Sequence, residues 1–221
     1  MSKEIIFRGI NVKNKSFELF LLLIFLSVIT AFAFNYIFLS DELLSLSFEG
    51  ILASDRINGM IELSHKWQWV GYVLIPVMIL IRVGYTAACL YMGCFIAEIR
   101  VHFGKLFKIA LVADFVFVVA GIMKLVFLIF FKDISTLDDL QFQPLSIMEL
   151  FDRSAIEPCF IYPLSVINLF ELLYWLVLTG LLSEVIEKPF IKSLKTVIFS
   201  YGSGLLLWVL VGMFLTLNLL Q

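Results

Sequence analysis

Charged residues are scarce in this chain, and their scarcity excludes an ordinary water-soluble domain. Asp, Glu, Lys and Arg make up 15% of the 221 residues, against roughly a quarter in typical soluble domains. Hydrophobic residues make up 62%, and the mean hydropathy is +1.03. So few charges could not cover so much apolar surface in water, and the same composition excludes a disordered or collagen-like chain. The remaining class is an integral membrane protein.

The chain also lacks the residue patterns of metal sites and of common enzymes. Its three cysteines, Cys89, Cys94 and Cys159, form no C-x-x-C pair, and its two histidines, His65 and His102, add no zinc-ligand spacing. It has no glycine-rich phosphate loop, no H-E-x-x-H and no G-x-S-x-G motif. A formal charge of -2 argues against binding to nucleic acid. We therefore predict a protein that is not an enzyme and has no metal, cofactor or nucleic-acid partner.

Long hydrophobic runs are what the chain has instead. A helix of roughly 20 residues crosses the hydrocarbon core of a bilayer, and these runs lack the alternation of a membrane barrel. We predict an all-α polytopic bundle, with a short basic cytoplasmic tail over 1–18 and a single membrane domain over 19–221. The five predicted transmembrane helices cover residues 19–39, 67–97, 109–131, 160–182 and 196–220.

The distribution of basic residues predicts the orientation of these helices. Most Lys and Arg residues lie in the segments 3–15, 100–108 and 188–195, whereas the other two connections are acidic. Because basic residues favour the cytoplasmic side, we predict the N-terminus inside and the C-terminus outside. The expected location is a bacterial inner membrane, where the lipid bilayer is the first partner.

The two long outer loops are expected to contain short amphipathic helices. Over 144–151, Ser146 and Glu149 have the spacing of a capping box, and apolar residues recur every third position. The segment 43–52 is similarly amphipathic. Such helices could rest on the membrane surface or cover the mouth of the bundle as a lid.

Ionisable residues inside the predicted spans form a candidate charge network. A charge at mid-bilayer costs about 2.5–3.5 kcal/mol on insertion scales, so these residues are expected to find partners. Arg82 and Glu171 both lie centrally, and we predict that they pair and join the second and fourth spans. Asp114 is expected near the inner boundary, and Lys124 near enough to the outer surface to snorkel. The pair could fix helix register only, or could relay protons or ions.

Small residues mark predicted close contacts between helices. Four-residue spacing of small residues lets helix backbones approach, within one bundle or between two copies. Pro76 is expected to kink the second span. The candidate packing residues are Gly84, Ala88, Gly93, Ala97, Gly202 and Gly204.

The C-terminal half carries a set of apolar and aromatic motifs in a fixed order. Tyr162-Pro163 is followed by Asn168-Leu169-Phe170, Tyr174-Trp175, Gly180-Leu181-Leu182, Lys188-Pro189-Phe190 and Ser193-Leu194-Lys195. This order resembles the five-span membrane domain of the Yip family, the Rab-interacting membrane proteins and their bacterial relatives. The resemblance implies a non-enzymatic membrane protein of the bacterial type. The inside tail lacks the acidic, proline-containing segment of the eukaryotic relatives, so a Rab-type partner is not expected.

Two functions follow from these observations. The first is a scaffold or accessory subunit that organises membrane or assists trafficking or transport, bound to another membrane protein or to itself. The alternative is a small transporter or permease subunit that uses Arg82, Glu171 and Lys124 for substrate or proton coupling.

Overall fold

The computed structural model describes residues 15–48, 53–132, 134 and 136–219. Within them the chain is helical, which confirms the predicted all-α class; the one extended contact there is a bridge between Ser146 and Asn168. The α-helices are α1 (Lys15–Phe38), α2 (Asp41–Phe48), α3 (Ser54–Ile96), α4 (Phe103–Ala113), α5 (Phe115–Phe131), α6 (Pro158–Val166), α7 (Leu169–Val185), α8 (Phe190–Val197) and α9 (Ser203–Leu219). Short 3-10 helices η1 (Leu137–Gln141), η2 (Ile147–Leu150) and η3 (Arg153–Ala155) and a π-helix η4 (Ile198–Gly202) complete the order.

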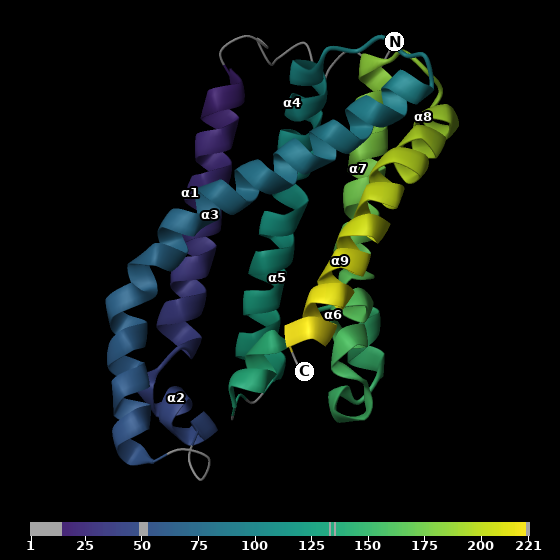
Figure 1. The fold of residues 1–221 in the computed structure, drawn as a ribbon. Coiled ribbons are helices and arrows are strands. Elements are labelled where there is room, and N and C mark those ends of the chain that lie inside the picture. The colour runs from purple at the N-terminus through teal and green to yellow at the C-terminus, as the bar shows by residue number, and fades with distance from the viewer. Residues whose placement is uncertain (1–14, 49–52, 133, 135, 220–221) are drawn as a thin grey trace.

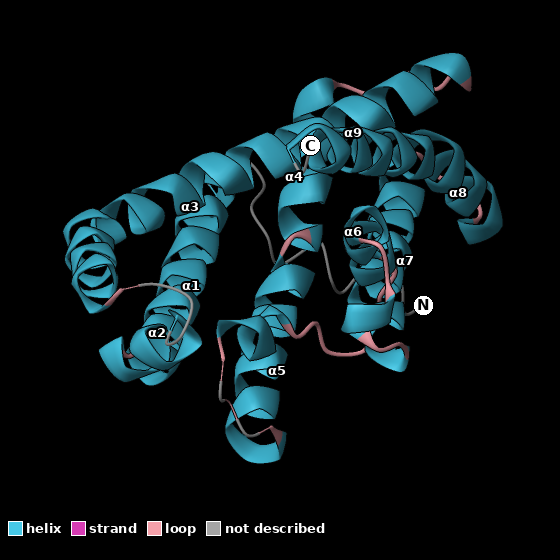
Figure 2. Ribbon diagram, turned by 60° about the horizontal axis from the view of Figure 1, so that its bottom comes forward, coloured by secondary structure: helices cyan, strands magenta, loops and turns pink. Residues whose placement is uncertain are grey.

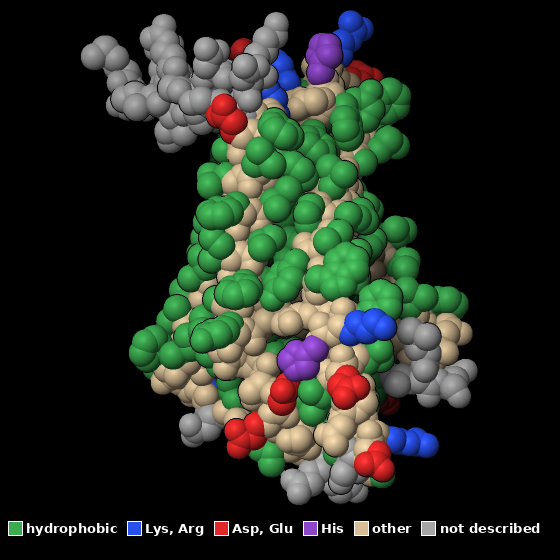
Figure 3. All heavy atoms as spheres, turned by 90° about the vertical axis from the view of Figure 1, so that its left-hand side faces the viewer, with side chains coloured by type: hydrophobic (Ala, Val, Ile, Leu, Met, Phe, Trp, Pro, Cys, Tyr) green, Lys and Arg blue, Asp and Glu red, His purple; other side chains and the backbone are tan. Residues whose placement is uncertain are grey.

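Four helical segments of the described chain are long and apolar enough to cross a membrane. They are Ser16–Phe38, Asp55–Ile96, Phe103–Phe131 and Phe190–Asn218. Figure 3 shows hydrophobic side chains over the middle of one face, with charged side chains gathered toward its two ends. A soluble protein would bury this apolar band. The exposed band therefore supports the prediction that the chain is a membrane protein.

The predicted fourth span, 160–182, is not one continuous helix. It consists of α6 and α7, which are separated at Ile167 and Asn168. Asn168 is the N-cap of α7, because its side chain accepts a hydrogen bond of 2.8 Å from the Glu171 backbone N–H. Asparagine favours such a cap, and so it starts a new helix where a continuous apolar run predicts only one.

The loop between α5 and α6 satisfies the backbone at the α6–α7 junction. The N–H of Ile147 donates to the carbonyl of Ile167 over 3.0 Å, and the N–H of Leu169 donates to the carbonyl of Leu145 over 3.1 Å. Backbone N–H and C=O groups inside a folded protein are almost always paired. This loop therefore completes the α6–α7 junction.

The helix α3 crosses one face of the bundle. In Figures 1 and 2 it passes beside α1 toward one end and beside α8 toward the other, while α5 and α7 lie behind it. It changes direction along its length (Figure 1), and it contains Pro76, which removes one internal hydrogen bond. The bend lets α3 contact helices from both halves of the chain.

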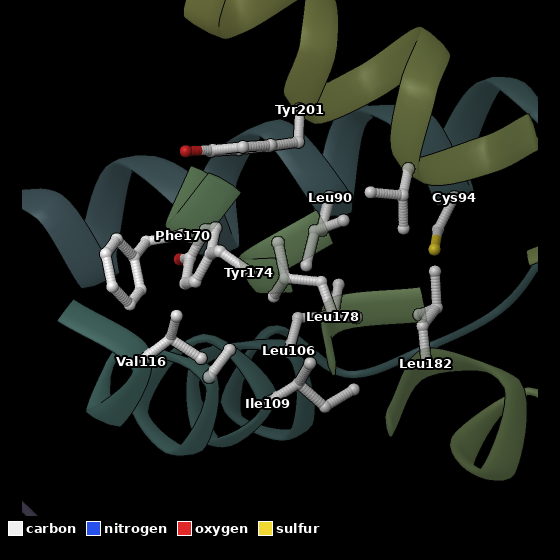
Figure 4. Packing of buried hydrophobic residues seen from close by; sticks show 12 residues of the cluster. Leu90, Cys94, Leu106, Ile109, Val116, Phe170, Tyr174, Leu178, Leu182 and Tyr201 are labelled. Carbon is white, nitrogen blue, oxygen red and sulfur yellow. The ribbon is translucent and has the colours of Figure 1, made fainter. Parts of the chain in front are cut away.

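The largest core cluster joins α3, α4, α7 and the start of the last span. Leu90, Leu106, Tyr174 and Leu178 are fully buried in it, and Figure 4 shows their side chains converging. A second cluster packs α1 against α3 and α4 around Leu23. These two clusters hold α3 in place from both sides.

The outer connections contain short helices, but the expected capping box is wrong. The predicted segment 43–52 contains most of α2, and its last four residues lie outside the described residues. Ser146 precedes η2, yet its buried hydroxyl has no hydrogen-bond partner in the described chain. Glu149 instead accepts a 3.0 Å hydrogen bond from the Gln143 backbone N–H. The capping box forms one helix earlier, where the carboxylate of Asp139 accepts the backbone N–H of Thr136.

Three of the predicted packing glycines lie at close helix contacts. A Cβ on Gly93 would overlap Ser200, one on Gly202 would lie 2.9 Å from the Trp175 ring, and one on Gly204 would meet Cys89. These contacts bring η4 and α9 against α3 and α7, as small residues permit. The prediction is wrong for Gly84, where an added Cβ would meet nothing within 4 Å.

The remaining two predicted packing residues lie on an open surface. Ala88 and Ala97 are exposed, and they line a groove of about 650 Å³ between α3 and the α8–α9 segment. Among the described residues they are therefore not covered by another helix.

Candidate functional site

An ion pair that is buried on its acidic side joins α3 to the junction of α4 and α5. The guanidinium of Arg82 on α3 meets the carboxylate of Asp114, between α4 and α5, through Nε–Oδ1 and Nη2–Oδ2 distances of 2.7 and 2.6 Å. Asp114 is fully buried, while 44% of the Arg82 side chain is exposed. The guanidinium also lies 4.4 Å from the centre of the Phe117 ring. This two-pronged contact is the strongest geometry available to an arginine and a carboxylate.

The predicted pairing of Arg82 with Glu171 is therefore wrong, and depth explains why. Asp114 was placed near the inner boundary because its apolar run begins at residue 109. The helix itself begins at Phe103, so Asp114 lies eleven residues, or about 16 Å, along the span. The helix α3 runs obliquely across the bundle (Figure 1), and its Arg82 reaches Asp114 at that point of the span.

Glu171 is held by two aromatic donors instead of by the arginine. Its Oε1 accepts hydrogen bonds from the Tyr201 hydroxyl, at 2.8 Å, and from Trp175 Nε1, at 2.9 Å. Both bonds use the same oxygen, and Oε2 has no hydrogen-bond partner among the described residues. The residue is 8% exposed. The carboxyl group is thus fixed in direction while one oxygen stays available.

Arg82 and Glu171 line one cavity even though they do not pair. This inner cavity has a volume of about 520 Å³ and lies among α3, α5, α6, α7 and the last span. Thr86, Tyr201 and Trp208 also contribute to its wall. Most of the wall is apolar, with a cation and a carboxyl group among aromatic rings. That composition is typical of a binding site for a small organic molecule.

The rim of the inner cavity carries exposed apolar side chains. Met78 and Ile81 on α3 and Trp208 on α9 are 64%, 52% and 49% exposed. Trp208 Nε1 donates to the Tyr162 hydroxyl over 2.9 Å, which joins α9 to α6 at this rim. Apolar side chains are thus exposed on the surface of the bundle where they line this cavity.

A buried hydrogen bond fixes the wall between α3 and α7. The Tyr174 hydroxyl donates to Oγ1 of Thr86 over 3.0 Å, and the Tyr174 ring packs on Phe117 with centroids 4.8 Å apart. We expect Tyr174→Phe to lower the free energy of unfolding by about 1 kcal/mol, because the substitution leaves the Thr86 hydroxyl without this donor. Thermal unfolding in a mild detergent measures it. Tyr36→Phe on the exposed surface of α1 is the control, and equal shifts for both variants would contradict the prediction.

The N-cap of α7 gives a second prediction. Asn168→Ala removes the acceptor for the Glu171 N–H at the broken span, and helix caps contribute about 1 kcal/mol. We expect a fall of that size in the free energy of unfolding, with Asn168→Asp closer to the parent. Asn35→Ala, which removes a 3.0 Å contact with Tyr72, is a polar control away from the junction. Equal stability of Asn168→Ala and the parent would show that the cap contributes nothing.

Lys124 belongs to two further cavities that adjoin the inner one. A side cavity of about 640 Å³ lies between α1, α3 and α5 and is lined by both Lys124 and Arg82. An outer cavity of about 620 Å³ is lined by Lys124 and Arg153 under the outer loop. The ammonium of Lys124 lies 5.4 Å from the centre of the Phe34 ring. Lys124 is only partly buried, and its snorkelling to the outer surface stays a prediction.

The aromatic residues of the site were not predicted as functional. Tyr201, Trp175 and Trp208 read as ordinary apolar positions in sequence, because their hydrogen bonds depend on which helices meet. The π-helix Ile198–Gly202 turns Tyr201 toward Glu171, and such insertions occur often at functional sites. The cluster Gly202-Ser203-Gly204 was the available signal, and it predicted packing only.

Within the described residues, no group of three or more His, Cys, Asp or Glu side chains could hold a metal ion. The comparisons with protein-family models, curated proteins and solved structures find no match to this chain. Interpretation of the site therefore depends on its own geometry.

Proposed function

We propose that the chain is a small membrane carrier or permease subunit that binds an amphipathic molecule in the inner cavity. The observation that supports this proposal is the cavity itself: an arginine and a glutamate lie in an apolar chamber that has exposed apolar side chains at its rim. A polar head would lie beside Arg82, and an apolar chain would lie along Met78, Ile81 and Trp208. This function uses binding and movement, and it needs no catalytic step.

The number of transmembrane passes and their orientation are part of this proposed function. We infer five passes, in which α6 and α7 together form the fourth as a broken span. Broken helices occur in transporters, where their ends face the bound substrate. The connections 97–102 and 186–189 lie at one end of the bundle, and α2 with the 3-10 helices lies at the other (Figure 1). The bias of basic residues supports the proposal that the first end faces the cytoplasm of a bacterial cell. Reporter fusions at the two chain ends test this, and reporters in the same compartment would contradict it.

A cavity-filling variant tests ligand binding. Ser165→Trp places an indole at the wall shared by the inner and outer cavities. Leu172→Trp, on an exposed surface of α7, is the matched control. The parent and Leu172→Trp, in phosphatidylcholine nanodiscs, are expected to retain added lauroyl lysophosphatidic acid above empty discs. Ser165→Trp is expected to retain much less, and equal retention by both variants would refute binding in the cavity.

A scaffold function is the second candidate, and one observation favours it. The groove between α3 and the α8–α9 segment is lined by small side chains, among them Ala88, Ala97 and Ser203. Small side chains permit close approach of another transmembrane helix, from a second copy or another membrane protein. Ala88→Trp is expected to reduce co-purification of differently tagged copies if a copy occupies the groove. The resemblance to the Yip family, which implies this type of function, stays a prediction.

A further inference from the structure

The side and outer cavities contain positive charge without matching negative charge. The charged residues that line the outer cavity are Lys124 and Arg153, and those that line the side cavity are Lys124 and Arg82. Within the described part of the chain, no acidic residue lines either cavity. Glu171 lines the inner cavity alone of the three. Lys124 lines both the outer and the side cavity, and each of these cavities contains one arginine as well.

Two acidic side chains of the loop that follows α5 already have partners. Glu149 lies close enough to attract Lys124 electrostatically, but Oε1 of Glu149 accepts the Gln143 backbone N–H. Asp139 is 3.4 Å from the ammonium of Lys132, which is itself among the cations that repel Lys124. Lys124 has no hydrogen-bond or ion-pair partner in the described chain, and its contact there is the Phe34 ring. A lysine inside an apolar span without a carboxylate is costly unless something else supplies the anion.

The two arginines differ from Lys124 because each already donates hydrogen bonds to other groups of the chain. Arg82 donates to Asp114 through Nε and Nη2. Among the described residues Nη1 has no acceptor, so it can donate to a ligand. Arg153 donates to the side chain and the carbonyl of Gln141 at 3.0 and 3.2 Å. These bonds fix Arg153 at the outer cavity. The three cations thus line adjoining cavities: Arg153 lines the outer one, Lys124 the outer and side ones, and Arg82 the side and inner ones.

The three cavities adjoin one another, because they share lining residues. The outer and inner cavities share Gln143, Tyr162 and Ser165 in their walls, and the side and inner cavities share Met78, Arg82 and Phe117. An acyl chain can therefore leave toward the exposed rim while its head stays beside Lys124.

We propose that Lys124 is the anchor for an anionic oxygen group, a phosphate or a carboxylate, carried on an acyl chain. This inference rests on the proposed function and adds the class of ligand. The anion supplies the partner that Lys124 lacks, Arg82 Nη1 and Arg153 flank it, and the chain occupies the apolar wall. An uncharged amphiphile would leave Lys124 as it is and would bind more weakly.

Three matched probes test the class of ligand. Lauroyl lysophosphatidic acid carries a chain and a phosphate, monolauroylglycerol carries the chain alone, and glycerol 3-phosphate carries the phosphate alone. Binding is measured by retention on the full-length protein in phosphatidylcholine nanodiscs against empty discs. We expect the phosphate-bearing amphiphile to bind at least about tenfold more tightly than monolauroylglycerol, as one charge-assisted contact gives. Tight binding of glycerol 3-phosphate alone would assign the site to a soluble phosphate and overturn the acyl-chain part.

Lysine variants locate the anchor. Lys124→Met is expected to remove most of the preference for the phosphate-bearing probe, and Lys124→Arg to retain it. Lys66→Met is the matched control, because Lys66 lies exposed on α3 and is not among the residues lining the three cavities. Lys124→Met removes an unpaired charge from a span, so it is expected to fold, and its thermal unfolding checks this. An unchanged preference in folded Lys124→Met overturns the inference.

The outcomes separate this inference from the function on which it rests. Equal binding of the charged and uncharged amphiphiles, both blocked by Ser165→Trp, overturns the role of Lys124 and leaves the carrier function standing. Failure of both amphiphiles to bind above empty discs overturns both.

Discussion

Arg82→Met is expected to lower the free energy of unfolding by about 3–5 kcal/mol, because it leaves a carboxylate buried without its partner. Asp114 is fully buried, and both of its oxygens accept hydrogen bonds from the Arg82 guanidinium. Unfolding in a mixed-micelle denaturant titration measures the loss. Arg56→Met, which removes an exposed arginine from the outer part of the same helix, is expected to change stability little.

The double variant separates an ion pair from simple packing. Asp114→Leu alone leaves Arg82 without a partner, although this side chain is partly exposed to the cavity, so the expected loss is smaller than for Arg82→Met. Combining Arg82→Met with Asp114→Leu removes both charges, and replacement of a buried pair by apolar residues is often neutral or stabilising. We therefore expect the double variant to be more stable than Arg82→Met. Additive losses would show that the two residues are not coupled in this way.

The same pair shows how far the sequence could predict the site. Composition and run length predict a membrane bundle, and they select Arg82 and Asp114 as buried charges that need partners. Choosing the partner requires the depth of each residue, which depends on where a helix begins and how it tilts. Asp114 lies deeper than its apolar run indicates because α4 starts at Phe103, with polar and basic residues in its first turns. Those residues count against a span in hydropathy but not against a helix.

The break between α6 and α7 is a second feature that local pattern does not predict. The run over 160–182 is apolar enough for one helix, and Asn168 alone gives little reason to divide it. The division is stable because residues from a distant loop pair with the backbone on both sides of it, through Ile147 and Leu145. The cavity depends on this break, because Asn168 and Glu171 line it at the start of α7. Its shape is thus a tertiary property.

The contacts made by the glycines of α3 also depend on tertiary structure. Spacing of small residues predicts that Gly84 and Gly93 are alike, since both lie in α3 and each is followed by alanine four residues later. The structure separates them because the last span, with its π-helix, crosses α3 at Gly93 and leaves Gly84 open. Which glycine is at a contact depends on the crossing point, and a single helix does not contain that information.

This difference predicts that the same substitution, glycine to alanine, changes stability differently at the two positions. Gly93→Ala places a methyl group where the Cβ and Oγ of Ser200 already lie, and neither atom belongs to a long flexible side chain. Forcing extra volume into packed helices costs about 1–3 kcal/mol. We expect a loss of that size by thermal unfolding in detergent, even though alanine favours a helix by up to about 1 kcal/mol over glycine. Gly84→Ala keeps the helix gain without the overlap, so it is expected to be neutral or slightly stabilising.

A compensating change tests whether the overlap itself causes the loss. Ser200→Gly removes the atoms that the new methyl group would meet, so Gly93→Ala with Ser200→Gly is expected to recover part of the stability lost in Gly93→Ala. The recovery is incomplete, because Ser200 also donates a 2.7 Å hydrogen bond to the Thr196 carbonyl and because glycine weakens a helix. A double variant less stable than either single variant would show that overlap with Ser200 is not the cause of the loss in Gly93→Ala. The packing that turns Tyr201 toward Glu171, and with it one wall of the inner cavity, depends on the close crossing of α3 and η4 at Gly93.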